Sequence, residues 1–147
     1  MEIAILALGC FWGPEIKFSE INGIKKTEVG YCGGNSPNTS YKEVCSGSTN
    51  HAEVVRLEFD PNIISYENII ETFFKFHDPT TLNSQGPDFG TQYRSEIFYE
   101  NENQKKIAKK VLDSINEKLS GKVVTKISPV NNYCKAEEYH QKYLKKN

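Results

Sequence analysis

Apolar and polar positions follow two different periods along this chain, and these periods predict where strands and helices lie. Residues 1–8 form an almost continuous apolar run, which is typical of a buried strand. Residues 11–21 instead repeat apolar side chains at the spacing of an amphipathic helix. Residues 24–31 and 52–59 have the composition of strands. The first half of the chain is therefore predicted to run strand, helix, strand, strand.

The second half adds helices with clear start signals. Ser65 is a suitable N-cap for a helix over 65–77. Asn101, with Gln104 three residues later, resembles a capping arrangement for a helix over 101–119. The remaining predicted elements are a strand over 94–99, a short strand over 123–128 and a last helix over 136–144.

The order of the first six elements predicts the fold class. Strand, helix, strand, strand, helix, strand matches the split βαβ or ferredoxin-like pattern. We therefore expect an α+β fold, with a mainly antiparallel sheet, helices packed on it and extra elements at the C-terminal end. A length of 147 residues suits one hydrophobic core, and no repeat or linker divides the chain, so residues 1–147 are expected to form a single domain.

Composition and charge exclude several functions. With 18 basic and 19 acidic residues, the chain offers no electrostatic case for binding nucleic acid. No apolar stretch approaches the roughly 20 residues needed to cross a bilayer, and the N-terminus lacks the pattern of a signal peptide. We therefore expect a cytoplasmic protein with reduced thiols at its four cysteines. No Cys-x-x-Cys pair is present, and Cys32, Cys45 and His51 fit no standard ligand spacing, so no metal is expected.

The first candidate for chemistry is Cys10, in the segment Gly9-Cys10-Phe11-Trp12-Gly13 between the first strand and helix. The N-terminus of a helix favours an anion, so this position is expected to lower the thiol pKa and enrich the nucleophilic thiolate. The neighbouring Phe11 and Trp12 suggest an apolar ligand. Alternatively, Cys10 is a small buried hydrophobic residue and both aromatic side chains are ordinary core anchors.

Two long polar loops, residues 32–50 and 78–92, supply further candidates. Glu53 begins the strand that follows the first loop; if it is buried, its pKa rises and it becomes a general acid near neutral pH. Tyr41 and Tyr93 carry phenols that can donate hydrogen bonds to a developing oxyanion. The alternatives are a solvated glutamate at a strand end and ordinary half-buried tyrosines.

Two other functions remain open on these residues. Cys10, His51 or His140, and Asp88 can be combined into the triad of a cysteine hydrolase, although the sequence alone does not supply its geometry. A non-catalytic redox-sensing module, whose Cys10 reacts once and stops, is the other alternative.

Several separated segments together resemble one known family, the type A peptide methionine sulfoxide reductases. They span most of the chain in the family's order. The matching segments are Gly9-Cys10-Phe11-Trp12-Gly13, Tyr41 through His51-Ala52-Glu53-Val54-Val55, Gly86 through Tyr93-Arg94-Ser95, and more weakly Ala136-Glu137-Glu138-Tyr139-His140-Gln141.

The resemblance implies a role for each candidate residue. Cys10 corresponds to the nucleophile that attacks the sulfoxide sulfur, and Glu53 to the acid that protonates the sulfoxide oxygen. Tyr41 and Tyr93 correspond to hydroxyl donors to that oxygen. The remaining substrate-binding residues implied by the resemblance are Phe11, Trp12, Asp88, His140 and Tyr143, of which the first two form walls of a slot for the S-methyl group.

The resemblance also implies the rest of the cycle. The family reduces the S epimer of methionine sulfoxide, free or within proteins, through a sulfenic acid on the nucleophilic cysteine. No cofactor is needed beyond an external reductant such as thioredoxin or dithiothreitol, and a monomer is expected. Many relatives carry recycling cysteines in a glycine-rich C-terminal tail that this sequence lacks. Cys134 is the first choice for the resolving thiol; Cys32, Cys45, or direct reduction by a small thiol are the alternatives.

Overall fold

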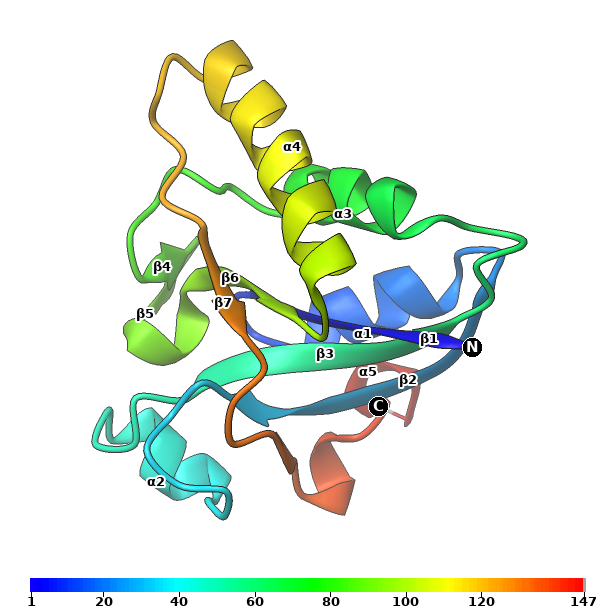
Figure 1. Ribbon diagram of the computed structural model, residues 1–147. Helices are drawn as coiled ribbons and strands as arrows, with labels where there is room; N and C mark the ends of the chain where they lie inside the picture. The colour runs from blue at the N-terminus through cyan, green and yellow to red at the C-terminus, as the bar shows by residue number, and fades with distance from the viewer. Residues whose placement is uncertain (147) are drawn as a thin grey trace.

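The computed structural model describes residues 1–146, which form a mixed α/β structure around a six-stranded sheet (Figure 1). The strands of this sheet are β1 (Glu2–Leu8), β2 (Ile24–Cys32), β3 (Ala52–Phe59), β6 (Ser95–Tyr99), β7 (Lys126–Pro129) and β8 (Cys134–Lys135). A separate hairpin pairs β4 (Ser84–Gln85) with β5 (Asp88–Phe89). The helices are α1 (Trp12–Ser19), α2 (Tyr41–Cys45), α3 (Tyr66–Lys75), η1 (Thr91–Tyr93), α4 (Glu102–Lys118), η2 (Glu138–His140) and α5 (Tyr143–Lys146).

The sheet order brings distant parts of the sequence to one edge. The strands lie in the order β7-β6-β1-β3-β2-β8, and every neighbouring pair is antiparallel except β6 and β7. Because β1 runs antiparallel to both β3 and β6, its C-terminal end lies beside their N-terminal ends. The register shows this directly, with Leu8 opposite Ser95 of β6 and Leu6 opposite Val55 of β3.

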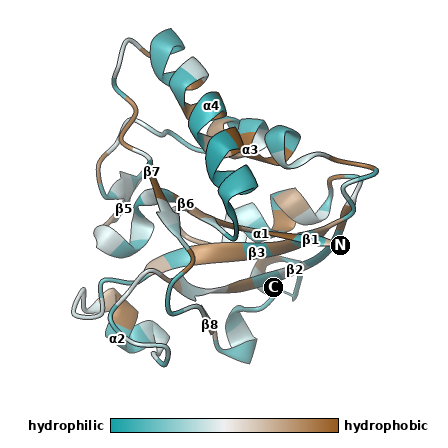
Figure 2. Ribbon diagram, in the orientation of Figure 1, coloured by the Kyte–Doolittle hydropathy of each residue, from teal (hydrophilic) through white to brown (hydrophobic). Residues whose placement is uncertain are grey.

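Both faces of the sheet carry buried apolar side chains, because successive residues of the central strands point to opposite faces and both sets are apolar. Side chains from α1, α3 and α4 pack on one face and form the main core, where brown apolar positions of the sheet meet the helices (Figure 2). This core includes Leu6, Leu8, Val29, Val55, Leu57 and Phe59 from the strands, and Phe18, Ile69, Ile70, Phe73 and Ala108 from the helices. The opposite face packs against Val130 and Tyr133, in the segment that crosses from β7 to β8 (Figure 1).

Local capping explains where two of the helices begin. The Ser65 side chain accepts a hydrogen bond from the Asn68 N–H at 3.0 Å, and the Asn101 side chain accepts one from the Gln104 N–H at 2.9 Å. Each satisfies an N–H that has no partner within its helix. The predicted starts of α3 and α4 agree with these caps.

Two sequence-based expectations about secondary structure are wrong. The predicted helix over 136–144 is instead the 3₁₀ turn η2 followed by the short α5, because Lys142 takes a left-handed φ of 52° that interrupts a helix. The loop expected over 32–50 contains α2, which Ser40 caps by accepting from the Glu43 N–H. Within residues 1–146, no helix combines the length and apolarity required to span a membrane.

Candidate active site

Cys10 lies in the short turn between β1 and α1, and Gly9 makes that turn possible. Gly9 has a φ of 96°, which L side chains rarely adopt, and a Cβ there would lie 2.9 Å from the Gln85 side chain. The chain can therefore leave β1, pass close to the β4–β5 hairpin and enter α1 within three residues. Cys10 is partly buried at this junction, at the edge where β1, β3 and β6 meet.

The environment of Cys10 keeps its thiol protonated, so the expectation of a lowered pKa is wrong. Burial raises the pKa of Cys10 to about 11, and the negative charges of Glu53 and Asp88 add to the rise. The Trp12 backbone N–H lowers the pKa, as expected near a helix start, but its effect is smaller than that of burial. Cys10 is therefore a thiol at neutral pH.

Glu53 is buried beside Cys10 and carries an unsatisfied oxygen. Its exposed fraction is 1%, and it faces the same side of the sheet as the core residues Val55 and Leu57. One carboxyl oxygen, Oε1, accepts a hydrogen bond from the Phe11 N–H at 3.2 Å. The other, Oε2, is buried without a hydrogen-bond partner among the described residues. A group that is buried in this way is expected to have a partner, which a substrate or water can supply.

The pKa of Glu53 suits proton donation at neutral pH. Burial raises it to about 8, against the lowering effect of the Phe11 N–H, and the negative charge of Asp88 raises it further. The carboxyl is therefore mainly protonated at pH 7. This burial is the condition under which the sequence predicts a general acid at this position.

Two phenols surround the Glu53 carboxyl. Tyr41 is the first residue of α2, and Tyr93 is the last residue of η1. Burial raises the pKa of Tyr93 to about 12 and that of Tyr41 well above its usual range, and in both cases the charge of Glu53 contributes. Both hydroxyls therefore keep their protons and can donate hydrogen bonds near Glu53.

Aromatic rings form a wall on the α1 side of the site. The Trp12 indole stacks on Tyr143, with ring centroids 3.8 Å apart and an interplanar angle of 10°, and its Nε1–H donates to His140 Nδ1 at 3.0 Å. The His140 ring also contacts Phe11 at 5.2 Å and Tyr41 at 4.4 Å between centroids. Residues from both ends of the chain thus meet around one buried imidazole.

Asp88 lies on β5, in the hairpin that packs against Gly9. Its charge raises the pKa values of Cys10, Glu53 and Tyr93. Electrostatics therefore connect Asp88 to the nucleophile, the carboxyl and one phenol. None of the contacts described above connects the remaining predicted site residue, Cys134, to Cys10. Cys134 lies on β8, and its Sγ is 3.9 Å from the Thr39 carbonyl oxygen.

Comparison with known proteins decides the family. A family model described as "Peptide methionine sulfoxide reductase" matches residues 2–147. The chain belongs to this family. It is 70% identical to the peptide methionine sulfoxide reductase MsrA of Pelagibacter ubique, over 99% of both chains.

Solved structures of family members have the same architecture. The reduced form of Mxr1 from Saccharomyces cerevisiae is 43% identical, with a TM-score of 0.94 over 99% of this chain and 85% of that protein. The same protein has been crystallised in complex with Trx2; that form is 27% identical and has a TM-score of 0.69 over 97% of this chain and 84% of its own.

In the described part of this methionine sulfoxide reductase, no hydrogen bond joins His51 or His140 to Cys10. His51 Nδ1 accepts from the Gly34 N–H at 3.1 Å, and its Nε2 lies 2.7 Å from the Ser36 carbonyl oxygen. His140 Nδ1 accepts from Trp12. Both nitrogens of His51 are therefore engaged elsewhere, whereas His140 has its Nδ1 engaged and its Nε2 buried without a hydrogen-bond partner in the part of the chain that the structure describes. Among residues 1–146, no cluster of three potential metal-ligating side chains is present.

Sequence reasoning missed a carboxylate that braces this reductase's site. Glu137 accepts from the Tyr31 hydroxyl at 2.8 Å and from the Tyr41 N–H at 2.9 Å, so it holds α2 against β2. Burial raises the pKa of Glu137, but these hydrogen bonds and the charge of His140 together lower it by more. The net shift of the pKa is therefore downward. Glu137 lies in the weakest of the segments that carry the family resemblance, and its neighbour His140 was the residue chosen there.

Proposed function

We propose that this protein reduces methionine sulfoxide to methionine, with Cys10 as the nucleophile and Glu53 as the proton donor. One observation carries the proposal: a protonated, buried carboxyl with a free oxygen lies within electrostatic reach of a partly buried thiol. A sulfoxide needs both groups, because its oxygen is a poor leaving group until it is protonated. Family membership supports the same reaction.

The chemical step balances with these two groups alone. Cys10 Sγ loses its proton and bonds to the sulfoxide sulfur while Glu53 protonates the sulfoxide oxygen. The S–O bond of the substrate and the new Sγ–S bond then both break as the hydroxyl passes to Cys10 Sγ, which leaves methionine and a sulfenic acid on Cys10. The proton released by the thiol restores Glu53. The substrate sulfur is reduced by two electrons, and the Cys10 sulfur is oxidised by two.

The surrounding side chains suit a methyl sulfoxide. We assign Phe11 and Trp12 to the walls that hold the S-methyl group, and the Tyr41 and Tyr93 hydroxyls to hydrogen bonds with the sulfoxide oxygen. The high pKa values of both phenols support a donor role. The other proposed substrate-binding residues are Asp88, His140 and Tyr143. The S epimer, free or in proteins, follows from the family resemblance.

A turnover assay with methionine sulfoxide and dithiothreitol tests this function. We expect repeated release of methionine, many equivalents per enzyme, with matching consumption of thiol. A cysteine hydrolase would instead cleave an ester or amide without using reductant, and a redox sensor would stop after about one equivalent. Failure of the wild-type protein to turn over either sulfoxide epimer would refute the proposal.

Recycling needs a reductant but no bound cofactor. We propose that a second thiol attacks the sulfenic acid to form a disulfide and water, and that thioredoxin opens this disulfide by exchange. The complex of the related Mxr1 with Trx2 supports a partner of this kind. The sequence-based choice of Cys134 as the second thiol stays a prediction. Cys45 is the alternative second thiol, because its charge contributes to the pKa of Cys10 and its side chain shares a hydrogen bond with Tyr41.

We expect one round of sulfoxide reduction without reductant to join Cys10 to Cys45. The enzyme has four cysteines, so disulfide formation leaves two titratable thiols, whereas a persistent sulfenic acid leaves three. Peptide mapping identifies the pair. Each single variant starts with three thiols: Cys45→Ser is expected to stop at the sulfenic acid and retain two, whereas the matched Cys134→Ser is expected to form the disulfide and retain one. A Cys10–Cys134 link would exclude Cys45 and support the choice made from the sequence.

We also propose a fold type, a domain extent, an oligomeric state and a location. The four central strands have the order β6-β1-β3-β2 with antiparallel neighbours, which supports a ferredoxin-like core extended by β7 and β8. A single domain over residues 1–147 is supported by the family match across residues 2–147. We propose a monomer in the cytoplasm, where thioredoxin-type reductants keep thiols reduced.

A further inference from the structure

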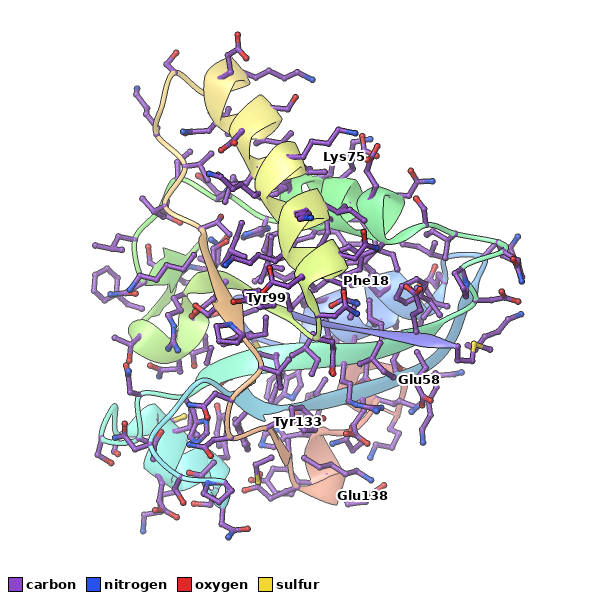
Figure 3. All side chains as sticks on the ribbon, in the orientation of Figure 1. Phe18, Glu58, Lys75, Tyr99, Tyr133 and Glu138 are labelled. Carbon is purple, nitrogen blue, oxygen red and sulfur yellow. The ribbon has the colours of Figure 1, made fainter. Side chains whose placement is uncertain are left out.

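The segment after β8 passes back over α1 and β2, and we call residues 137–143 the C-terminal strap. Glu138, labelled in Figure 3, lies in its first turn. The strap is attached to β2 by Gln141, whose side-chain amide donates to the Val29 carbonyl oxygen and accepts from the Val29 N–H, both at 2.9 Å. One side chain thus pairs with the backbone of β2 in the way a neighbouring strand would.

Glu15 attaches the strap to α1 and is buried, with an exposed fraction of 2%. Its Oε1 accepts from the Lys142 backbone N–H at 2.6 Å, and its Oε2 accepts from the Thr27 hydroxyl at 2.9 Å. Both oxygens are therefore satisfied, as a buried carboxyl requires. Each partner belongs to a different element, so this single carboxyl joins α1, β2 and the strap.

The strap residues on either side of this attachment both contact Trp12. His140 accepts the indole N–H, and Tyr143 stacks on the indole ring. Between them, Lys142 has a φ of 52°, and this left-handed turn brings both side chains to the same indole. Trp12 and Glu15 are also neighbours on α1, three residues apart, and line the same cavity of about 30 Å³ together with Lys142.

We propose that Glu15 is a positioning residue, which holds the C-terminal strap so that His140 and Tyr143 fix the Trp12 indole at the substrate slot. This inference rests on the proposed function only where it concerns substrate. Glu15 itself lies behind Trp12 and is bonded to the strap and to β2, so it acts through Trp12. Its loss leaves the Lys142 backbone N–H without its acceptor. The strap then keeps its hydrogen bonds to β2, but His140 and Tyr143 hold the indole less firmly.

The test compares Glu15→Ala and Glu15→Gln with the wild-type protein and with Glu67→Gln. Glu67 is a matched control, because it is a surface glutamate whose partner is Lys110, on α4. For Glu15→Ala we expect KM for methionine sulfoxide to rise about tenfold while kcat changes less than about twofold, since Cys10 and Glu53 are untouched. Glu15→Gln, which keeps one acceptor oxygen, is expected to have an intermediate KM.

The fluorescence of Trp12 gives a readout that does not depend on activity, because Trp12 is the single tryptophan of the chain. In Glu15→Ala the emission is expected to shift to longer wavelength as the indole leaves Tyr143, whereas Glu67→Gln keeps the wild-type spectrum. A folded Glu15→Ala with wild-type KM and emission overturns the proposal. If no variant or wild-type protein reduces sulfoxide, the proposed function fails, and the emission alone decides the role of Glu15.

A second pair of variants keeps the proposal testable if Glu15 variants do not fold. Lys142→Pro removes the N–H that Glu15 accepts and forbids a φ of 52°, whereas Lys142→Gly retains the N–H and adopts that angle easily. We expect the raised KM and shifted emission in Lys142→Pro and not in Lys142→Gly. Equal behaviour of the two variants overturns the proposal.

Discussion

Replacing Cys10 with serine is expected to abolish the reduction of methionine sulfoxide, lowering kcat more than about 10⁴-fold while preserving the fold. A hydroxyl is a far weaker nucleophile toward sulfur than a thiolate. It also cannot take up the sulfoxide oxygen as a cysteine sulfur does when it becomes a sulfenic acid. Serine is close to cysteine in size, and position 10 is a partly buried turn, so packing changes little. Steady-state turnover with dithiothreitol measures the loss, and circular dichroism checks the fold.

A single-turnover experiment without reductant supplies the control. Wild-type protein is expected to release about one methionine per enzyme, and Cys45→Ser and Cys134→Ser are expected to do the same, because the first step needs only the nucleophile. Cys10→Ser should release none. Release of a full equivalent by Cys10→Ser would show that another group attacks the sulfoxide, and the mechanism given above would be wrong.

Replacing Glu53 with glutamine is expected to lower kcat/KM about 10²–10³-fold, because the amide keeps the shape of the side chain but cannot donate a proton to the sulfoxide oxygen. The Phe11 N–H can still donate to the amide oxygen, so the turn that carries Cys10 is retained. Glu58→Gln is the matched control, since Glu58 lies on the same strand and pairs with Lys26 and Arg56 away from the site.

The pH profile of this variant separates acid catalysis from a structural role. Glu53 has a pKa of about 8 and Cys10 one of about 11, both raised by burial. The step proposed above starts with both groups protonated, the Cys10 thiol and the Glu53 carboxyl, and this form dominates below about pH 8. In the wild type kcat/KM is therefore expected to be level below about pH 8 and to fall above it, as Glu53 loses the proton that it donates.

In Glu53→Gln the bend near pH 8 disappears, because the amide has no such proton to lose. Measurement of kcat/KM for both proteins on either side of about pH 8 checks the assignment. A bend that persists near pH 8 in the glutamine variant would assign that titration to another group and remove Glu53 from the acid role.

The sequence predicted those parts of the fold that local patterns determine. The apolar run of β1, the β-rich pattern of β3 and the caps of α3 and α4 each act over a few residues, so they can be recognised without a structure. The helix α2 was missed although its signal is local: Ser40 followed by Glu43 is a capping pair, and it lies inside a stretch whose polarity suggested only a loop.

The errors arose where tertiary contacts override local preference. The residues of the C-terminal strap favour a helix by composition, but Gln141 bonds to Val29, which is 112 positions away, and Lys142 is held in a left-handed turn. The thiol pKa of Cys10 was expected to fall because the helix start is visible in the sequence. The opposing burial is not visible there, because it depends on how β3 and the β4–β5 hairpin close around the site.

The high pKa of Cys10 protects its sulfur from direct oxidation and alkylation. Hydrogen peroxide and alkylating reagents attack a sulfur in proportion to its thiolate character, and an acidic, low-pKa cysteine would be consumed by them. Here the resting sulfur is neutral and has carboxyl neighbours that disfavour its ionisation. A repair catalyst of this design is expected to react slowly with the oxidants that damage methionine, and to attack only when a sulfoxide binds beside Cys10 and takes up the proton of Glu53.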